Sequence, residues 1–482
     1  MSKSVRSYYK FHYRELLDFR YRLYLLTKEK NLRKRAKIAC NLLAKASAYG
    51  LGIYSSMELE KPFLDLAKTI TTKKNIQYEH DSFLHVMTTA YQTGGHTRVV
   101  ERWIDISPLN QKHSIILLNQ GDSICPKKIY DITQEHSGSL IILNEKNIVT
   151  RAEKLREIAQ SYEYIVLHIH MDDPTAIIAF GTNEFTRPVI LFNHADHTFW
   201  CGISIADMIA DIRDNNFTLK NRGGQNSFTI RIPFESNPLI QNYPKSQKQS
   251  RIDLGLPLDK KIILTVGGKH KYVPFAGHEF CNTLSKIIMS KDDVVCYGIG
   301  PSPDIGEWNK YKRRFIALGE IAYGEQYFDY INACDIFVNS FPIGGATTML
   351  DAMQFFKPVL SYSIFRDNLG DIICGIETNY DFNLFSKKLC DMLDSRTMRE
   401  NIAQMQYKQV LQYHGIDVWY KNILEMLFRT PKNHKVNDLC NKMTRYKIDD
   451  LSVMISLWNR AIVKKRVSLK DIYHQIRILL HL

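Results

Sequence analysis

The chain has 482 residues, of which 45% are hydrophobic and 24% charged, the composition of an ordinary globular protein. This length exceeds what one hydrophobic core usually serves, so we expect two domains with additional segments. The formal net charge of +14 excludes an acidic, solvating chain. It directs attention to anionic partners, namely phosphorylated substrates, anionic lipid or nucleic acid.

Targeting and redox features are sparse in this sequence. It has no run of about eighteen apolar residues, and its first residues lead into Tyr, Arg and Lys, so we expect neither an integral membrane segment nor a secretory signal. Nine cysteines stand singly, without the close pairs that zinc sites or dithiols need. We therefore expect reduced thiols and a cytoplasmic protein.

The positive charge is concentrated at the two ends of the chain. Residues 1–40 hold twelve Lys or Arg against three acidic residues, and the last twenty residues are again basic. Residues 5–50 form a basic amphipathic helical region, followed by a connection over 51–80. The region suits either a solvated appendage or a surface that contacts an anionic membrane or a partner. Charge confined to the ends does not form a nucleic-acid stripe, so we expect no nucleic-acid partner.

Short apolar runs alternate with helical patterns in the middle of the chain, which is typical of βαβ units and a parallel sheet. In the first half, helices are expected at 152–162 and 173–179. The strands expected there are 83–88, 114–118, 139–143, 164–169 and 189–192. A polar, proline-bearing stretch over 236–260 then indicates a linker.

The same pattern restarts after the linker. The strands expected in the second half are 261–266, 293–297, 314–318, 335–338 and 358–361. A long amphipathic helix over 400–428 can cross back to the first half. The expected domains are a basic helical appendage (1–80), a first α/β lobe (81–235), the linker (236–260), a second α/β lobe (261–430) and a basic helical C-terminal appendage (431–482).

Ligands of parallel sheets bind at the carboxyl ends of the strands, so the residues that follow each strand are the first candidates. In the second half, Gly267, Gly268 and Lys269 follow its first strand, and Gly319 follows its third. Either Lys269 or the nearby Lys271 can supply a point charge for a phosphate.

The most informative stretch is Val338–Met353, in which a buried strand leads through Gly344 and Gly345 into an apolar helix opened by Thr347 and Thr348. Glycines at a helix start let the backbone approach a ligand, and the free N–H groups of the first turn attract phosphate. Asp351, one turn further on, could accept hydrogen bonds from ribose hydroxyls. The stretch predicts a nucleoside-diphosphate site; the alternative is a plain strand–turn–helix connection.

Imidazoles and carboxylates follow the strands of the first half. They suit general acid–base catalysis, whereas a metal site or a hydrogen-bonded polar cluster are the alternatives. No firm metal-ligand spacing is present, so we expect no metal. The residues are Gly94, Gly95 and His96; His168, His170 and Asp172; and His194, Asp196 and His197.

These residues resemble those of the GT-B glycosyltransferases, nucleotide-sugar-dependent enzymes with two facing Rossmann-like lobes. The resemblance covers roughly residues 80–430 and rests on Gly94-Gly95-His96, Gly267-Gly268-Lys269 and Phe341–Met353. The last segment is similar to the donor-binding segment of the O-GlcNAc transferase and bacterial protein-glycosyltransferase group. This resemblance implies that Gly345, Thr347 and Thr348 meet the pyrophosphate, Asp351 the ribose, and a lysine near 269 the phosphates.

One position departs from the family pattern. Many retaining GT-B enzymes carry two glutamates at a fixed spacing here, and alignment of Asp351 with the second places Ile343 at the first. We therefore favour an inverting reaction, which needs a base for the acceptor. The candidates are His96, His194 and Asp196, with departure of the nucleotide assisted by Lys269 and the amide cradle rather than by a metal.

The sequence thus predicts an α/β protein of the GT-B class with helical appendages, acting as a glycosyltransferase. Its expected partners are a nucleotide sugar, which is a substrate rather than a cofactor, and a glycan, lipid-linked or protein acceptor. Contact with the inner face of an anionic membrane is a further expectation. A nucleotide-sugar epimerase of the same fold and a non-catalytic nucleotide-binding module are the alternatives.

Overall fold

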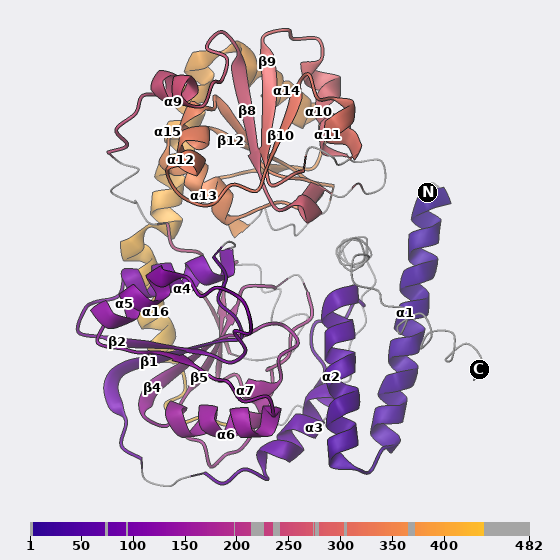
Figure 1. Ribbon diagram of the computed structural model, residues 1–482, viewed down its shortest axis with the longest axis vertical. Helices are drawn as coiled ribbons and strands as arrows, with labels where there is room; N and C mark the ends of the chain where they lie inside the picture. The colour runs from indigo at the N-terminus through magenta and orange to yellow at the C-terminus, as the bar shows by residue number, and fades with distance from the viewer. Residues whose placement is uncertain are drawn as a thin grey trace.

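A computed structural model describes residues 3–72, 76–92, 95–196, 198–213, 226–234, 242–272, 274, 279–302, 306–364 and 372–437, with side chains from residue 12 onward except that of His270. Two parallel sheets, each covered by helices, form two lobes stacked one above the other (Figure 1). The predicted two-lobed α/β architecture is confirmed.

The first lobe is built on a parallel sheet with the strand order β3-β2-β1-β4-β5-β6-β7 among the described residues. Its strands are β1 (Glu79–Met87), β2 (Lys112–Leu117), β3 (Leu140–Ile142), β4 (Tyr162–His168), β5 (Val189–Asn193), β6 (Met208–Asp211) and β7 (Ser227–Thr229). Its helices are α4 (Gly95–Asp105), α5 (Lys127–Glu135), α6 (Ile148–Ala159) and α7 (Thr175–Phe180). Every strand predicted here is present, and β6 and β7 are additional.

The second lobe has the strand order β10-β9-β8-β11-β12-β13 within the described ranges, again all parallel. Its strands are β8 (Lys261–Val266), β9 (Val294–Ile299), β10 (Phe315–Gly319), β11 (Ile336–Val338), β12 (Val359–Tyr362) and β13 (Thr378–Asn379). Its helical elements are α9 (Gln247–Asp253), the short 3-10 helix η2 (Lys269–Tyr272), α10 (Phe280–Ile288), α11 (Gly306–Lys310), α12 (Glu325–Ala333), α13 (Thr347–Gln354) and α14 (Phe382–Asp394). Helix α9 lies inside the predicted linker and packs on α12.

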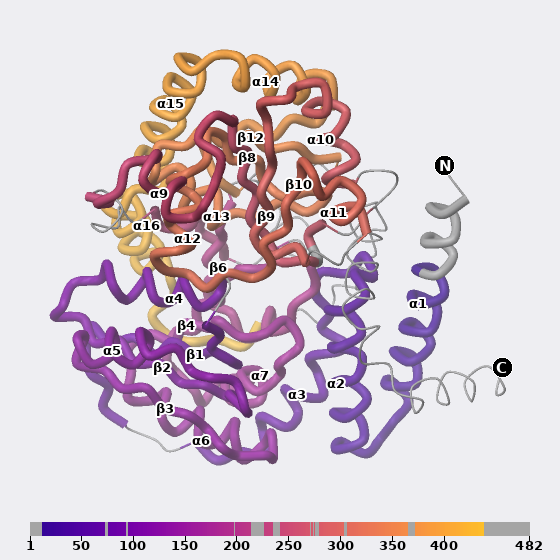
Figure 2. Tube along the Cα trace, turned by 45° about the horizontal axis from the view of Figure 1, so that its top comes forward, coloured from indigo at the N-terminus to yellow at the C-terminus, as the bar shows by residue number. Residues whose placement is uncertain are grey.

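The N-terminal helices α1 (Lys3–Lys28), α2 (Leu32–Tyr49) and α3 (Met57–Ala67) are part of the first lobe's hydrophobic core. Leu16, Phe19 and Leu43 share one buried cluster with residues of the sheet. The expectation of a plain connection over 51–80 is wrong, because α3 lies there. Figure 2 shows α2 between α1 and the rest of the lobe.

Two buried charged residues attach α3 to the lobe. The carboxylate of Glu60 accepts hydrogen bonds from the backbone N–H groups of Gly202 (2.8 Å), Ile203 (3.2 Å) and Ser204 (2.9 Å). On α6, the guanidinium of Arg156 donates to the carbonyl of Ala67 at the end of α3 and to those of Ile70, Ile178 and Ala179. These bonds satisfy backbone groups left open at the ends of α3 and α7.

The predicted helix over 400–428 is two helices, α15 (Arg396–His414) and α16 (Ile416–Arg429), separated at Gly415. Helix α16 returns to the first lobe, as expected, and Trp419 packs edge-on against Trp103 of α4 (ring centroids 5.4 Å apart). Beyond it, the buried imidazole of His434 bonds with Asp207 (2.7 Å) and with the carbonyl of Phe180 (2.8 Å). The lobes are therefore joined by buried contacts as well as by the chain.

None of the described helices combines the length and the apolar character needed to cross a membrane. The predicted C-terminal appendage lies mostly outside the described residues, which end at residue 437.

Replacement of Arg156 by Met should destabilise the first lobe by about 3–5 kcal/mol, because it leaves several buried carbonyl groups without a donor. Chemical denaturation followed by tryptophan fluorescence measures this loss. Lys154→Met on the same helix is the control, since the Lys154 side chain is 53% exposed and should change stability by less than about 0.5 kcal/mol. Equal stabilities of the two variants would contradict the anchoring role.

Candidate functional site

The turn between β11 and α13 is shaped by the buried side chain of Asn339. Its amide nitrogen donates to the carbonyl of Gly345 (3.2 Å), and its amide oxygen accepts from the Gly345 N–H (2.8 Å). A Cβ at Gly345 would lie 2.9 Å from Thr348 Oγ1, so any other residue here would require the Thr348 side chain to move. The prediction that Gly345 meets the pyrophosphate is corrected in one respect: its N–H is already used within the turn, so Gly345 contributes space rather than an amide donor.

Helix α13 begins at Thr347 directly after this turn, and no side chain caps its N-terminus. Thr348 Oγ1 is buried without a hydrogen-bond partner among the described residues. The first N–H groups of a helix carry a partial positive charge and attract anions. This end of α13 therefore offers donors for a phosphate, as the sequence predicted for Thr347 and Thr348.

The lysine at this site is Lys271 rather than Lys269. Lys269 is exposed on η2, whereas the partly buried ammonium of Lys271 donates to the carbonyl of Gly344 (3.2 Å). Burial lowers the pKa of Lys271 to about 8. The two residues are separated by one position, and the short helix η2 turns only Lys271 towards the turn before α13. Lys271 and the N-terminus of α13 are together called the cradle below.

The other predicted glycines have different roles. At Gly267 an added Cβ would lie 3.1 Å from Ser340 Oγ and 3.2 Å from Lys271 Cδ, so Gly267 makes room for the lysine stem. The carbonyl of Gly268 accepts from the N–H of Lys271 (2.9 Å) and forms the turn that η2 continues. Gly319, with a φ of 74°, is the last residue of the edge strand β10 and bonds with Gly300 and Pro301 rather than with the cradle.

The first lobe meets this cradle through the start of α4. A Cβ added at Gly95 would lie 3.3 Å from the methyl group of Thr347, so the N-termini of α4 and α13 face each other. Gly94 lies outside the described residues. His96 follows Gly95 at the start of α4, and its imidazole lies near those of His168, His170 and His194.

Asp351 has a different environment from the one predicted. Its buried carboxylate accepts hydrogen bonds from Arg102 Nη2 on α4 (3.3 Å) and from the hydroxyl of Tyr327 on α12 (2.9 Å). Arg98, one turn before Arg102, lies over the ring of Tyr323, 3.3 Å from its centroid. Both oxygens of Asp351 thus have a partner within the protein, and the residue joins the two lobes. The ribose contact stays a prediction.

His96 and His194 come together as the sequence predicted. Their ring centroids are 4.2 Å apart. Burial, together with His194 and His170, holds the pKa of His96 well below its usual value, while a hydrogen bond with the backbone of His168 acts in the opposite direction. Nε2 of His96 is buried and has no hydrogen-bond partner in the described part of the chain.

Asp196 does not share this arrangement. Its carboxylate forms a buried ion pair with Arg213, whose Nη2 lies 3.1 Å from Oδ1 and whose Nε also contacts it. A carboxylate held by a guanidinium is a poor proton acceptor, because protonation would leave the guanidinium charge buried and unpaired. Its predicted role as base is therefore corrected to a structural one. His197 lies outside the described residues.

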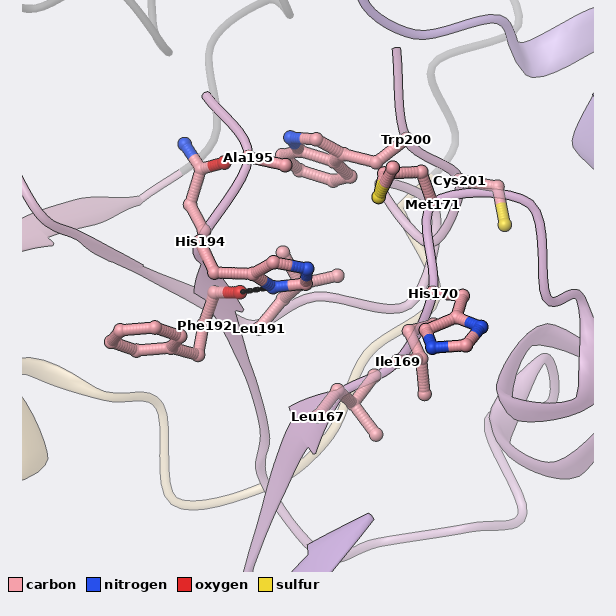
Figure 3. Close-up of a pocket in the computed structure, with 11 residues that line it drawn as sticks. Leu167, Ile169, His170, Met171, Leu191, Phe192, His194, Ala195, Trp200 and Cys201 are labelled. Carbon is pink, nitrogen blue, oxygen red and sulfur yellow. Dashed lines mark hydrogen bonds between the residues drawn. The ribbon is translucent and has the colours of Figure 1, made fainter. Parts of the chain in front are cut away.

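A small pocket opens beside these residues at the carboxyl ends of β4 and β5. Figure 3 shows His170 and His194 lining it from the two strand ends, with Trp200 and Cys201 along another side. His194 Nδ1 lies 3.4 Å from the carbonyl of Phe192. The pocket belongs to the first lobe and lies beside the imidazoles of His170 and His194.

Within the described ranges, no group of three or more His, Cys, Asp or Glu side chains is arranged to hold a metal ion. Sequence reasoning missed Asn339, Arg102 and the buried imidazoles of His85 and His113. For His85 and His113, the available signal was a histidine within an apolar strand. No signal in the sequence marked Asn339 or Arg102.

Comparison with solved structures places this architecture among known folds. Anabaena Alr3699/HepE, solved in complex with UDP, superposes with a TM-score of 0.53 at 15% identity over 72% of this chain and 99% of that chain. The Thermobaculum terrenum O-GlcNAc transferase gives 0.52 at 9% identity over 89% of this chain and 79% of that chain. The lipopolysaccharide outer core galactosyltransferase WaaB gives 0.51 at 15% identity over 72% and 99%.

The chain has the GT-B fold that these glycosyltransferases share. No family model matches the sequence. A search of curated proteins likewise finds no match. At such identities the likeness concerns the fold, and function has to be argued from the site.

Replacement of Asp351 by Ala should destabilise the protein by about 3–5 kcal/mol, because the buried charge of Arg102 loses its partner. Differential scanning calorimetry would record a melting point lower by several degrees. The double variant Arg102→Met with Asp351→Leu should recover part of the loss. Thr348→Ala is the control and should melt close to the native protein. A native melting point for Asp351→Ala would show that the ion pair does not hold the lobes.

Proposed function

We propose that this protein is a glycosyltransferase that takes its sugar from a nucleoside-diphosphate donor. The observation that carries the proposal is the meeting of a phosphate cradle in one lobe, formed by Lys271 and the N-terminus of α13, with Gly95 and His96 of the other. A donor diphosphate bound there would have its sugar at the boundary between the lobes, beside an imidazole.

The diphosphate would bind the first N–H groups of α13, the hydroxyl groups of Thr347 and Thr348, and the ammonium of Lys271. These donors stabilise the negative charge that develops when the bond between sugar and phosphate breaks. Solved neighbours include complexes with UDP and with UDP-glucose. UDP is therefore the probe with which to test this site.

Transfer would proceed by direct displacement with inversion. The acceptor oxygen forms its bond to the anomeric carbon as the bond to the diphosphate oxygen breaks, and the acceptor proton passes to Nε2 of His96. Three features support this: Nε2 of His96, which has no partner among the described residues, the contact of His96 with His194, and the buried apolar Ile343 at the position where many retaining GT-B enzymes carry an acid. The pocket beside His170 and His194 is the proposed entrance of the acceptor, which is a glycan, lipid-linked or protein hydroxyl.

UDP should bind with an affinity that falls about fivefold between pH 8 and pH 9. Only the protonated form of Lys271 attracts the diphosphate, and above its pKa of about 8 the free protein loses this proton. Titration calorimetry between pH 7 and 9 measures the slope. Lys271→Met should bind UDP weakly without the slope, and Lys269→Met should bind like the native protein. A larger effect at Lys269 than at Lys271 would contradict the cradle.

A screen of nucleotide sugars for thermal stabilisation, followed by mass analysis of products formed with cell extract, tests the reaction. We expect a product heavier by one sugar residue. His96→Gln should lower turnover at least about a hundredfold and keep the native affinity for UDP. Interconversion of free nucleotide sugars without transfer would indicate an epimerase instead, and donor binding without any turnover a non-catalytic module.

We also propose that α1 contacts an anionic membrane. Its inner face, with Phe19 and Leu26, is buried in the first lobe, while the opposite face carries Tyr13, Leu17, Tyr21, Tyr24 and Leu25, each 41–57% exposed. Exposed Arg14, Arg20 and Lys28 flank this aromatic stripe. Tyrosines and basic residues on one face of a helix are typical of a membrane-surface helix. The remaining basic C-terminal sequence would be repelled by this face, which favours lipid as its occupant.

Co-sedimentation with vesicles of phosphatidylcholine and phosphatidylglycerol tests this contact. We expect binding that weakens with salt and falls about tenfold or more when Tyr13, Tyr21 and Tyr24 are replaced by Ser. The control replaces Leu109 and Ile124, which are 71% and 72% exposed elsewhere on the first lobe, by Ser. Equal losses in both variants, or no binding by the native protein, would rule out a specific membrane face.

A further inference from the structure

The small pocket at the carboxyl ends of β4 and β5 is lined mainly by apolar side chains. In Figure 3, Met171 and Trp200 lie on one side of it, and Leu167 and Ile169 lie on the opposite side. The pocket has room for about one water-sized group, which is also the size of a methyl group. Because its inner end is apolar, a methyl group fills this space better than a water molecule does.

The mouth of the pocket lies at the imidazoles of the candidate active site. The aliphatic side chains of the lining and Trp200 are buried, whereas His170, Met171 and His194 are only partly buried. The ring of His96 lies 4.2 Å from that of His194 and 6.3 Å from that of His170, between centroids. A ligand whose hydroxyl reaches His96 would therefore have its neighbouring groups at this mouth.

The wall formed by Trp200 and Cys201 is held in place by two other segments. The N–H of Cys201 donates to the carbonyl of Met171 (2.9 Å). The next three residues, 202–204, donate their backbone N–H groups to the buried carboxylate of Glu60 on α3. The fold therefore sets the width of the pocket, and a rigid wall is what discrimination between groups of similar size needs.

An acetamido group matches both the inner end and the mouth. Its methyl group has the size of the inner space, and its amide carries a donor and an acceptor next to that methyl group. Burial lowers the pKa of His170, against the opposite effect of Asp173 and Asp172, so its imidazole is neutral at physiological pH and offers one N–H and one lone pair. A hydroxyl in place of the acetamido group would leave the inner space empty and lose its packing contacts.

Resting on the proposed function, we propose that this pocket selects an acceptor sugar that carries an acetamido group beside the hydroxyl to be glycosylated. The methyl group enters between Ile169, Met171 and Trp200, and the amide lies at the mouth against His170. The neighbouring hydroxyl is thereby directed to Nε2 of His96. The lining residues determine specificity and take no part in bond breaking. The acceptor hydroxyl thus belongs to a sugar and not to a protein side chain.

Saturation-transfer nuclear magnetic resonance in the presence of UDP tests the pocket without any need for turnover. The probes are the methyl glycosides of N-acetylglucosamine and N-acetylgalactosamine, each paired with the methyl glycoside of glucose or galactose. In at least one pair, we expect the acetyl methyl group to receive the strongest saturation and the hydroxyl counterpart to bind about ten- to a hundredfold more weakly. Equal binding within both pairs, or no binding by any probe, would overturn the proposal.

Met171→Ala enlarges the pocket, and the protein should stay folded because Met171 is partly exposed. The ratio of kcat/KM for the N-propionyl derivative of the preferred probe to that for the N-acetyl form should rise about tenfold, while the affinity for UDP stays native. Met289→Ala is the matched control, since Met289 is 50% exposed on the second lobe and should keep the native ratio. An unchanged ratio in Met171→Ala would contradict the pocket's role.

These measurements separate failure of the pocket from failure of the proposed function. A preference for acetamido probes without transfer from any nucleotide sugar would support the pocket and contradict the transferase activity. Transfer at equal rates to acetamido and hydroxyl acceptors would contradict the pocket and leave the transferase activity in place.

Discussion

The buried ion pair between Arg102 and Asp351 is the contact on which the site depends. It joins α4 of the first lobe to α13 of the second, and the hydroxyl of Tyr327 completes the bonds of the carboxylate. The pair links the last turn of α4 to the middle of α13, and Gly95 at the start of α4 lies against Thr347 at the start of α13. A buried pair of this kind contributes little net stability, but loss of one partner is costly. The constraint therefore favours one arrangement of the lobes, in which phosphate donors and an imidazole share a boundary.

The rest of the first lobe follows the same pattern, because there too buried polar groups join segments that are distant in the sequence. Glu60 and Arg156 attach the N-terminal helices by bonding open backbone groups, and His434 attaches the returning C-terminal segment. Each of these groups has its partners.

Much of the fold was predictable, since buried parallel strands are recognisable as short apolar runs wherever they are long enough. The strands missed were β6, β7 and β13, the last two of which have only three and two residues and lie at sheet edges. Helix α3 was missed because its polar surroundings resemble a connection. The division of 400–428 into two helices depends on Gly415, which lies where the chain changes from one lobe to the other.

The sequence by itself determined the two-lobed α/β class, the strand–turn–helix at Gly344–Thr348 where a phosphate cradle is predicted, and the gathering of His96 and His194, because strand ends and helix starts are local features. Only the tertiary structure decided which charged groups are available. Lys271 rather than Lys269 enters the cradle because η2 turns it inward. Asp351 and Asp196 have buried arginine partners from distant parts of the chain or from the next strand end. Pairing of this kind depends on contacts across the fold, which no local pattern encodes.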